Sequence, residues 1–189
     1  MIPTAVTPRA DTWPRGTLAA VMIGAALLAA LNLLTRNVAV PQLPAVFLFG
    51  TTLRLGIVVP IFFGVRFGPV VGFCVGAIGT FVSDLLTFGY FWNWEVGVGL
   101  IGAVAGLAPY IGARRRGFLA ELATAVIMGP LAIVAGTAFA SLTDIWVARL
   151  PPDQAINAEW LPVTLWDLSW GALSGLVHGA WWARQRKTR

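Results

Sequence analysis

Charged residues are scarce in this chain of 189 residues. They make up only 11% of it, whereas 58% of the residues are hydrophobic. An ordinary soluble domain carries about 25% charged residues, so this sequence has too few charges to cover a water-facing surface. The shortage excludes a soluble protein and predicts that much of the chain lies in a lipid bilayer.

Residues that carry redox, metal or nucleophilic chemistry are also scarce. Cys74 is the only cysteine and His178 the only histidine, which excludes an internal disulfide and a Cys/His metal cluster. No glycine-rich phosphate loop is present, so we expect no cofactor and no ATP hydrolysis by this chain itself. One enzymatic alternative stays open, because Ser174 and His178 are four residues apart and could form the dyad of an intramembrane serine hydrolase.

Long apolar runs are what the sequence has in abundance. A helix needs about 20 apolar residues to cross a bilayer, and the chain has room for six such helices. We therefore expect an all-α membrane protein: one integral membrane domain over residues 1–189, built as a bundle of six transmembrane helices. A cytoplasmic tail at 1–15, an outer loop at 45–52 and a polar loop at 149–162 flank the spans, which are expected at about 17–35, 53–65, 70–87, 96–113, 118–148 and 164–183.

The few basic residues predict the orientation. Cytoplasmic segments of membrane proteins are enriched in Lys and Arg. Three basic residues, Arg36, Arg54 and Arg149, fall on one side of the expected bundle. The other ten fall at the termini and at the turns after the second and fourth spans, which predicts cytoplasmic termini: Arg9, Arg15, Arg66, Arg114, Arg115, Arg116, Arg184, Arg186, Lys187 and Arg189. Because they cluster at helix ends, the net charge of +5 does not indicate a nucleic-acid partner.

Aromatic and polar residues gather on the expected outer side. Aromatic rings with a few charged or amide groups suit the binding of a planar polar molecule, although tryptophans also form belts at membrane interfaces. Glu95 and Arg54 favour binding or ion pairing, since a belt does not require them. The candidate substrate-binding residues are Arg54, Tyr90, Trp92, Asn93, Trp94, Glu95, Asp144, Trp166, Asp167 and Trp170.

Small residues form two patterns. In the first span, Ala25 and Ala29 share one helix face and Ala26 and Ala30 the next, and each pair would let another helix approach closely. That helix could belong to this bundle or to a separate subunit. A glycine ladder in the fourth span indicates packing within the bundle: Gly97, Gly99, Gly102 and Gly106.

Four segments together resemble a known family. They are the alanine-rich run Gly24–Leu31, the triplet 54–56, the Phe-Gly-Pro turn that opens 67–72, and the stretch 76–86, which ends in Ser-Asp-Leu-Leu. The chain resembles the substrate-binding S component of energy-coupling factor (ECF) transporters, nearest to the riboflavin-type branch. The resemblance covers nearly the whole chain.

The resemblance implies a function and a set of partners. Such a subunit captures a vitamin or related micronutrient at the outer face of a prokaryotic plasma membrane, and works with a transmembrane coupling subunit and two ATPases that use the ATP. The family's alanine stripe serves that docking, so the resemblance favours subunit contact for Ala25, Ala26, Ala29 and Ala30.

The ligand and one non-transport alternative stay open. Glu95 and Asp144 would suit a flat heteroaromatic ligand with donor groups or positive charge, whereas Arg54 could meet a carboxylate or phosphate. The residues by themselves also fit a structural membrane protein without a ligand.

Overall fold

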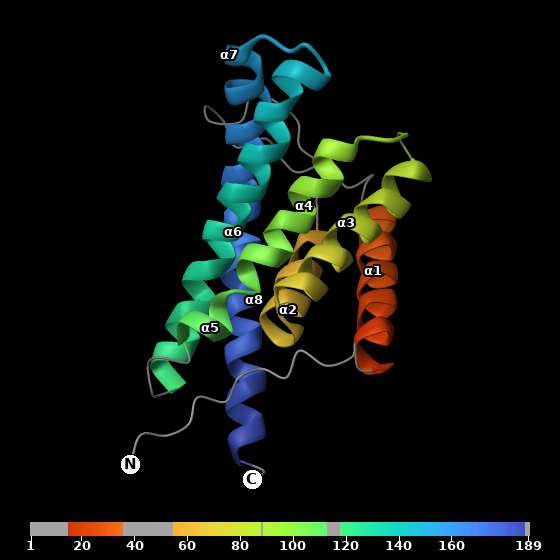
Figure 1. Ribbon diagram of the computed structural model, residues 1–189. Helices are drawn as coiled ribbons and strands as arrows, with labels where there is room; N and C mark the ends of the chain where they lie inside the picture. The colour runs from red at the N-terminus through yellow and green to blue at the C-terminus, as the bar shows by residue number, and fades with distance from the viewer. Residues whose placement is uncertain (1–14, 36–54, 88, 113–117, 188–189) are drawn as a thin grey trace.

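The computed structural model describes residues 15–35, 55–87, 89–112 and 118–187. Within these ranges every regular element is helical (Figure 1). Six helices have ten residues or more, and short helical elements join or precede some of them. The elements are α1 (Arg15–Thr35), η1 (Leu55–Ile57), α2 (Val58–Phe67), α3 (Pro69–Leu85), α4 (Trp92–Ala105), α5 (Ala108–Gly112), α6 (Phe118–Val147), α7 (Pro152–Gln154), η2 (Ala155–Trp160) and α8 (Leu161–Lys187).

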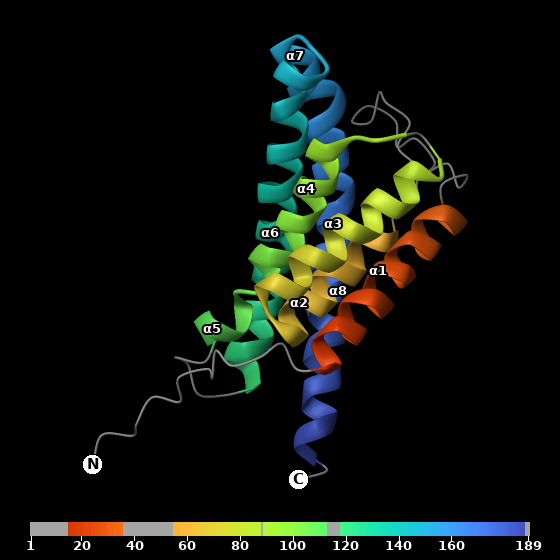
Figure 2. The same cartoon turned by 45° about the vertical axis from the view of Figure 1, so that its right-hand side comes forward.

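The long helices form a bundle in which helices that follow one another along the chain run in opposite directions (Figures 1 and 2). α3 packs between α1 and α4, α4 packs on α6, and α6 packs on α8, while α2 contacts α3, α4 and α8. The start of α1 and the end of α8 lie at the same end of the bundle (Figure 2). The connections from α3 to α4 and from α6 to α8 lie at the opposite end, which we call the distal end.

The turn between α2 and α3 follows directly from two residues. Gly68 has φ +98°, a backbone conformation that residues with a Cβ rarely adopt, and Pro69 occupies the first position of α3. Proline is suited to that position because its missing N–H would have no partner inside the helix. The predicted Gly-Pro turn is therefore confirmed.

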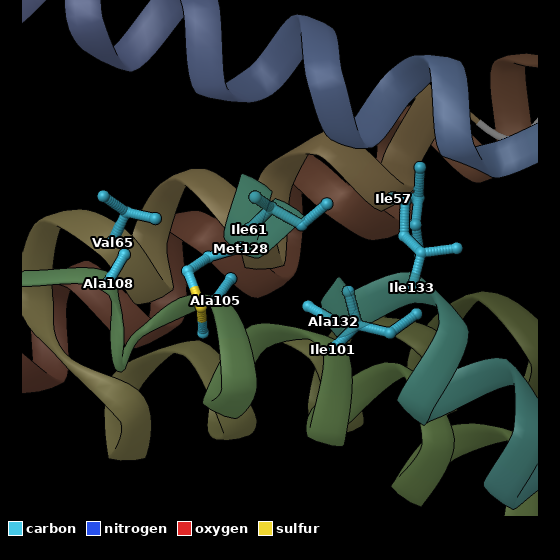
Figure 3. Packing of buried hydrophobic residues seen from close by; sticks show 9 residues of the cluster. All are labelled: Ile57, Ile61, Val65, Ile101, Ala105, Ala108, Met128, Ala132 and Ile133. Atoms are coloured by element: carbon cyan, nitrogen blue, oxygen red, sulfur yellow. The ribbon is translucent and has the colours of Figure 1, made fainter. Parts of the chain in front are cut away.

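One cluster of the hydrophobic core lies where η1, α2, α4, α5 and α6 meet, and a second lies between α1, α2 and α3. The side chains of the first cluster point toward one another from their elements, as Figure 3 shows. Burial of such side chains stabilises the bundle by about 25 cal/mol per Å² of apolar surface removed from water. The first cluster consists of Ile57, Ile61, Val65, Ile101, Ala105, Ala108, Met128, Ala132 and Ile133.

Glycines bring the helices into backbone contact. A Cβ on Gly102 would clash with the backbone carbonyl of Gly72 in α3, and one on Gly97 would lie 2.7 Å from the carbonyl oxygen of Gly136 in α6. Gly99 and Gly106 make similarly close approaches to Phe73 and Pro69. The glycine ladder therefore packs inside the bundle, as predicted.

Large apolar side chains also cover much of the outside of the bundle. Two helices of the described part, Gly16–Thr35 and Val126–Val147, are long and apolar enough to cross a membrane, and Leu55–Phe67 and Pro69–Leu85 are apolar but shorter. The most exposed apolar side chains on α1 are at least 62% exposed, which suits contact with lipid: Leu18, Met22, Ile23 and Leu34.

Two expectations about the elements were wrong. α4 begins at Trp92, so the aromatic segment up to Glu95 is the first turn of a helix, and the expected span 96–113 is divided between α4 and α5. The expected loop 149–162 is mostly helical, because α7 and η2 lead directly into α8. α6 agrees with the expected span 118–148, and it runs through Pro130 for 30 residues, about 45 Å, which is longer than a bilayer core of about 30 Å. The expected tail to residue 14 and the loop at 45–52 lie outside the described residues.

Candidate functional site

Asp144 is the centre of a buried polar cluster at the distal end. It lies one turn before the end of α6, where its side chain is only 6% exposed. Its Oδ1 accepts a hydrogen bond from Asn93 Nδ2 at 2.9 Å, and its Oδ2 accepts one from the indole N–H of Trp94 at 2.8 Å. Asn93 also donates to the carbonyl of Ala140 at 3.0 Å. The first turn of α4 is thereby fixed to the last turns of α6.

The cluster continues along one face of α6. Thr137, Ser141 and Asp144 are spaced by four and three residues, so they share a helix face, and all three are buried. The Thr137 hydroxyl lies 2.7 Å from the hydroxyl of Thr164 in α8. The Ser141 hydroxyl oxygen is buried and has no hydrogen-bond partner in the described part of the chain.

A small cavity adjoins this polar face. Its volume is about 10 Å³, which is room for about one water molecule. Trp94 and Val98 of α4, Thr137 of α6 and Asp167 of α8 contribute to its lining, and Ile57 of η1 lies across from them. Asp167 is 1% exposed. The cavity is thus formed by helices far apart in the sequence, and its surface is almost entirely apolar.

The tryptophans of η2 and α8 contribute further buried donors. Trp166 and Trp170 are half-buried, and Trp170 packs against the hydrophobic core. The indole nitrogens of Trp160, Trp166 and Trp170 are buried and have no acceptor among the described residues. Buried donors without partners are unusual in folded proteins and are often found where a ligand or water binds.

Three of the candidate residues lie elsewhere. Tyr90, Trp92 and Glu95 line an open groove of about 410 Å³ between α3 and α4. On α4, Trp92 and Glu95 face this groove, whereas Trp94 faces the small cavity between α4, α6 and α8. The candidate residues therefore divide into two groups on opposite faces of α4. Arg54 lies outside the described residues.

The two alanine pairs of α1 differ in exposure. Ala25 and Ala29 are 6% and 5% exposed and pack inside the bundle, whereas Ala26 and Ala30 are exposed. The face with Ala26 and Ala30 is therefore open to another helix, and the face with Ala25 and Ala29 is already covered.

Three polar residues of the site were not predicted from the sequence: Thr137, Ser141 and Thr164. Each is a single small polar residue in an apolar run, so none of them stands out by residue type. The spacing of Thr137, Ser141 and Asp144 was the signal that could have found two of them, since it predicts a polar stripe on one face of an apolar helix.

Ser174 is not arranged as a nucleophile. It is buried, and its hydroxyl donates to the carbonyl of Gly171 at 2.8 Å within the same helix. The side chain of His178 is outside the part that the structure describes.

A helical bundle with apolar outer faces and buried polar groups at one end is typical of membrane proteins that bind or carry a polar solute. Comparison with known proteins gives the particular family. The family model described as ECF-type riboflavin transporter, S component, matches residues 15–180. The chain belongs to this family, whose members are membrane proteins that bind the substrate of a transporter.

Curated relatives match over shorter stretches. A UPF0397 protein of Aliivibrio salmonicida is 42% identical over 66 residues, which are 34% of this chain and 36% of that protein. A UPF0397 protein of Streptococcus gordonii is 37% identical over 86 residues, which are 45% of this chain and 42% of that protein. The matched stretches thus span less than half the length of these relatives. No solved structure matches the chain.

Family membership decides between the alternatives left open by the sequence. The family consists of substrate-binding components of transporters and not of enzymes. It therefore excludes the serine hydrolase with Ser174 and His178, and it argues against a structural protein without a ligand.

Proposed function

We propose that this chain is the substrate-binding subunit of an ECF-type importer and captures a vitamin or related micronutrient at the distal end of α4, α6 and α8. The observation that carries the proposal is the polar cluster around Asp144. A carboxylate inside an apolar helical bundle is costly and is usually retained for binding or transport. Two donors already orient it, so its position is fixed before a ligand arrives.

The proposed ligand is a flat heteroaromatic molecule with hydrogen-bonding groups. Indole rings offer stacking surfaces, and the unpaired groups of Ser141, Trp166 and Trp170 offer polar contacts. Riboflavin is the first candidate, because the family description names it. A ligand with a carboxylate or phosphate is the second candidate, with Arg54 as its proposed partner.

Binding of such a ligand requires this end of the bundle to open. A site for a small organic molecule has a volume of about 300–1,000 Å³, whereas the cavity between α4, α6 and α8 holds about 10 Å³. Ile57 of η1 and Val163 of α8 are the apolar lining groups whose displacement would widen it. The structure is thus the closed state in this proposal.

The proposed partners are a transmembrane coupling subunit and two ATPase subunits. The exposed face of α1 with Ala26 and Ala30 supports this part, since small side chains let a partner helix approach closely. ATP would be used by the partner ATPases, and we propose no cofactor or metal for this chain. Ala25 and Ala29 would support that face from inside the bundle.

We also propose a location in the plasma membrane of a prokaryote, with six membrane crossings and both termini in the cytoplasm. The start of α1 and the end of α8 lie at the same end of the bundle, which supports an even number of membrane crossings. Labelling of single cysteines tests it in a Cys74→Ala background. A cysteine at Asp153 should react from outside intact cells, and one at Arg189 should react only after lysis. The reverse pattern would contradict the orientation.

The experiment that tests the function is a binding titration. The purified chain is titrated with riboflavin and then with a panel of vitamins, and tryptophan fluorescence reports the binding. We expect one saturable site. Asp144→Asn should weaken it, whereas Asp153→Asn, at an exposed carboxylate on α7, should not. A panel without any saturable ligand would contradict the proposal.

A further inference from the structure

The groove between α3 and α4 has a composition that the proposed substrate site does not explain. α3 provides one continuous apolar face with Phe73, Ala77 and Phe81, which are spaced by four residues, and Ile78 beside them. α4 provides Trp92, Glu95 and Val96 on the other side, and Tyr90 lies near the end. The two helices lie side by side along the groove (Figure 2).

Glu95 is the one charged side chain in this lining. It is only 6% exposed, and its Oε1 is buried without a hydrogen-bond partner in the described part of the chain. A buried carboxylate oxygen without a donor is costly, and a donor supplied by a ligand would remove that cost. The groove therefore favours an occupant with a positive charge.

Aromatic residues line the same groove as this carboxylate. Tyr90 and Trp92 are 62% and 42% exposed, so their ring faces are accessible. The rings of Phe81 and Tyr90 are edge-to-face, with centroids 5.9 Å apart and planes at 84°. Aromatic faces attract cations, and this attraction adds to that of a carboxylate. Ca²⁺ and Mg²⁺ fit poorly, because they require several oxygen ligands, and the described residues contain no cluster of three possible metal ligands.

We propose that the groove between α3 and α4 binds a primary ammonium group attached to an apolar body. The ammonium group donates a hydrogen bond to Glu95 Oε1, the rings of Tyr90 and Trp92 flank the charge, and the apolar body lies along Phe73, Ala77 and Phe81. This site is on the opposite face of α4 from Trp94 and Asp144, and it does not depend on the proposed substrate.

The proposal is tested with the full chain in maltoside detergent, which has no ammonium group. Calorimetry measures the binding of phenethylammonium, with uncharged phenethyl alcohol as the matched control ligand. We expect saturable binding of the amine and at least about tenfold weaker binding of the alcohol, because a charge-assisted hydrogen bond is lost.

Variants distinguish this site from other ways of binding an amine. Glu95→Gln keeps the shape of the side chain and should weaken phenethylammonium binding at least about tenfold. Trp92→Leu, at an exposed position that should not disturb folding, should weaken it about two- to fivefold. Asp153→Asn removes an exposed carboxylate on α7 and should leave the affinity unchanged. Equal affinity of the wild type and Glu95→Gln, or the absence of saturable binding, would overturn the proposal.

Two further samples identify the source of the ammonium group. Phosphatidylethanolamine is added to one and phosphatidylglycerol, which lacks an amine, to the other. Competition by phosphatidylethanolamine alone supports the site with a lipid headgroup as its occupant, and the absence of competition supports it with a free amine. If both lipids compete equally, the ammonium group of the lipid is not needed to displace phenethylammonium. This result would contradict the proposal.

Discussion

The carboxylate of Asp144 in α6 accepts the indole N–H of Trp94 in α4 at 2.8 Å, and this contact joins two helices at the distal end of the bundle. Replacement of Asp144 by Asn leaves one of two buried donors, Asn93 or Trp94, without its acceptor. We expect Asp144→Asn to destabilise the protein by about 1–3 kcal/mol. Thermal unfolding in detergent measures the loss, with Asp153→Asn as the control. An unchanged melting temperature would show that the contact contributes nothing to stability.

A substitution at Ser141 should affect protein stability and substrate binding differently. Its hydroxyl is fully buried and has no partner in the described structure, so Ser141→Ala removes an unsatisfied group at the expense of a very small void. We expect a melting temperature that is unchanged or higher, together with severalfold weaker substrate binding. Calorimetry and thermal unfolding on the same sample measure both. Unchanged affinity would place Ser141 outside the binding site.

The backbone contact between α3 and α4 should tolerate no added methyl group. A Cβ on Gly102 would meet the carbonyl of Gly72, and neither backbone can move without separating the helices. We expect Gly102→Ala to lower the stability by about 1–3 kcal/mol or more. Gly16→Ala is the matched control, because a Cβ at Gly16 meets nothing within 4 Å and alanine favours helix. If both variants melt alike, the helices are not in close contact.

The two alanine pairs of α1 should respond differently to enlargement. Ala26→Leu with Ala30→Leu changes an exposed face, so we expect an unchanged melting temperature but loss of a co-expressed coupling subunit on purification. Ala25→Leu with Ala29→Leu changes a buried face, and each replacement should destabilise the bundle by about 1–3 kcal/mol. Retention of the coupling subunit by the Ala26 and Ala30 variant would remove that face from the proposed interface.

Much of the helical framework could be predicted from the sequence. The apolar runs predicted helices where α1, α2, α3, α6 and α8 lie, because long uninterrupted apolar runs indicate helices that face lipid or the core of a bundle. Gly68 and Pro69 predicted the turn between α2 and α3 for a local reason, since only glycine readily adopts the required φ. The glycine ladder was also interpreted correctly as internal packing.

The wrong expectations came from applying a polar-loop pattern to helical segments. Residues 152–160 are polar and follow prolines, yet proline is favoured in the first turn of a helix, and α7 begins at Pro152. Likewise, the fourth span was expected to begin at residue 96, although aromatic residues are compatible with the first turn of a helix, and α4 begins at Trp92.

The division of the candidate residues could not be predicted from residue type alone. Trp92 and Trp94 are both tryptophans near the same helix end. Side chains two positions apart on a helix, however, point in directions that differ by about 200°. Trp94 therefore faces Asp144, and Trp92 faces the groove along α3. The start of α4 had to be known before the two faces could be separated, and the sequence-based start was four residues too late.

The affinity of the Asp144→Asn variant for substrate is the most direct test of a substrate site at the distal end of the bundle. The purified wild-type chain is titrated with riboflavin and the vitamin panel, and the ligand that binds is then titrated into the variant at a temperature where both are folded. We expect one saturable site in the wild type, an affinity at least about tenfold lower in Asp144→Asn, and an unchanged affinity in Asp153→Asn. Equal affinities for the wild type and Asp144→Asn would contradict a substrate site at this end of α4, α6 and α8.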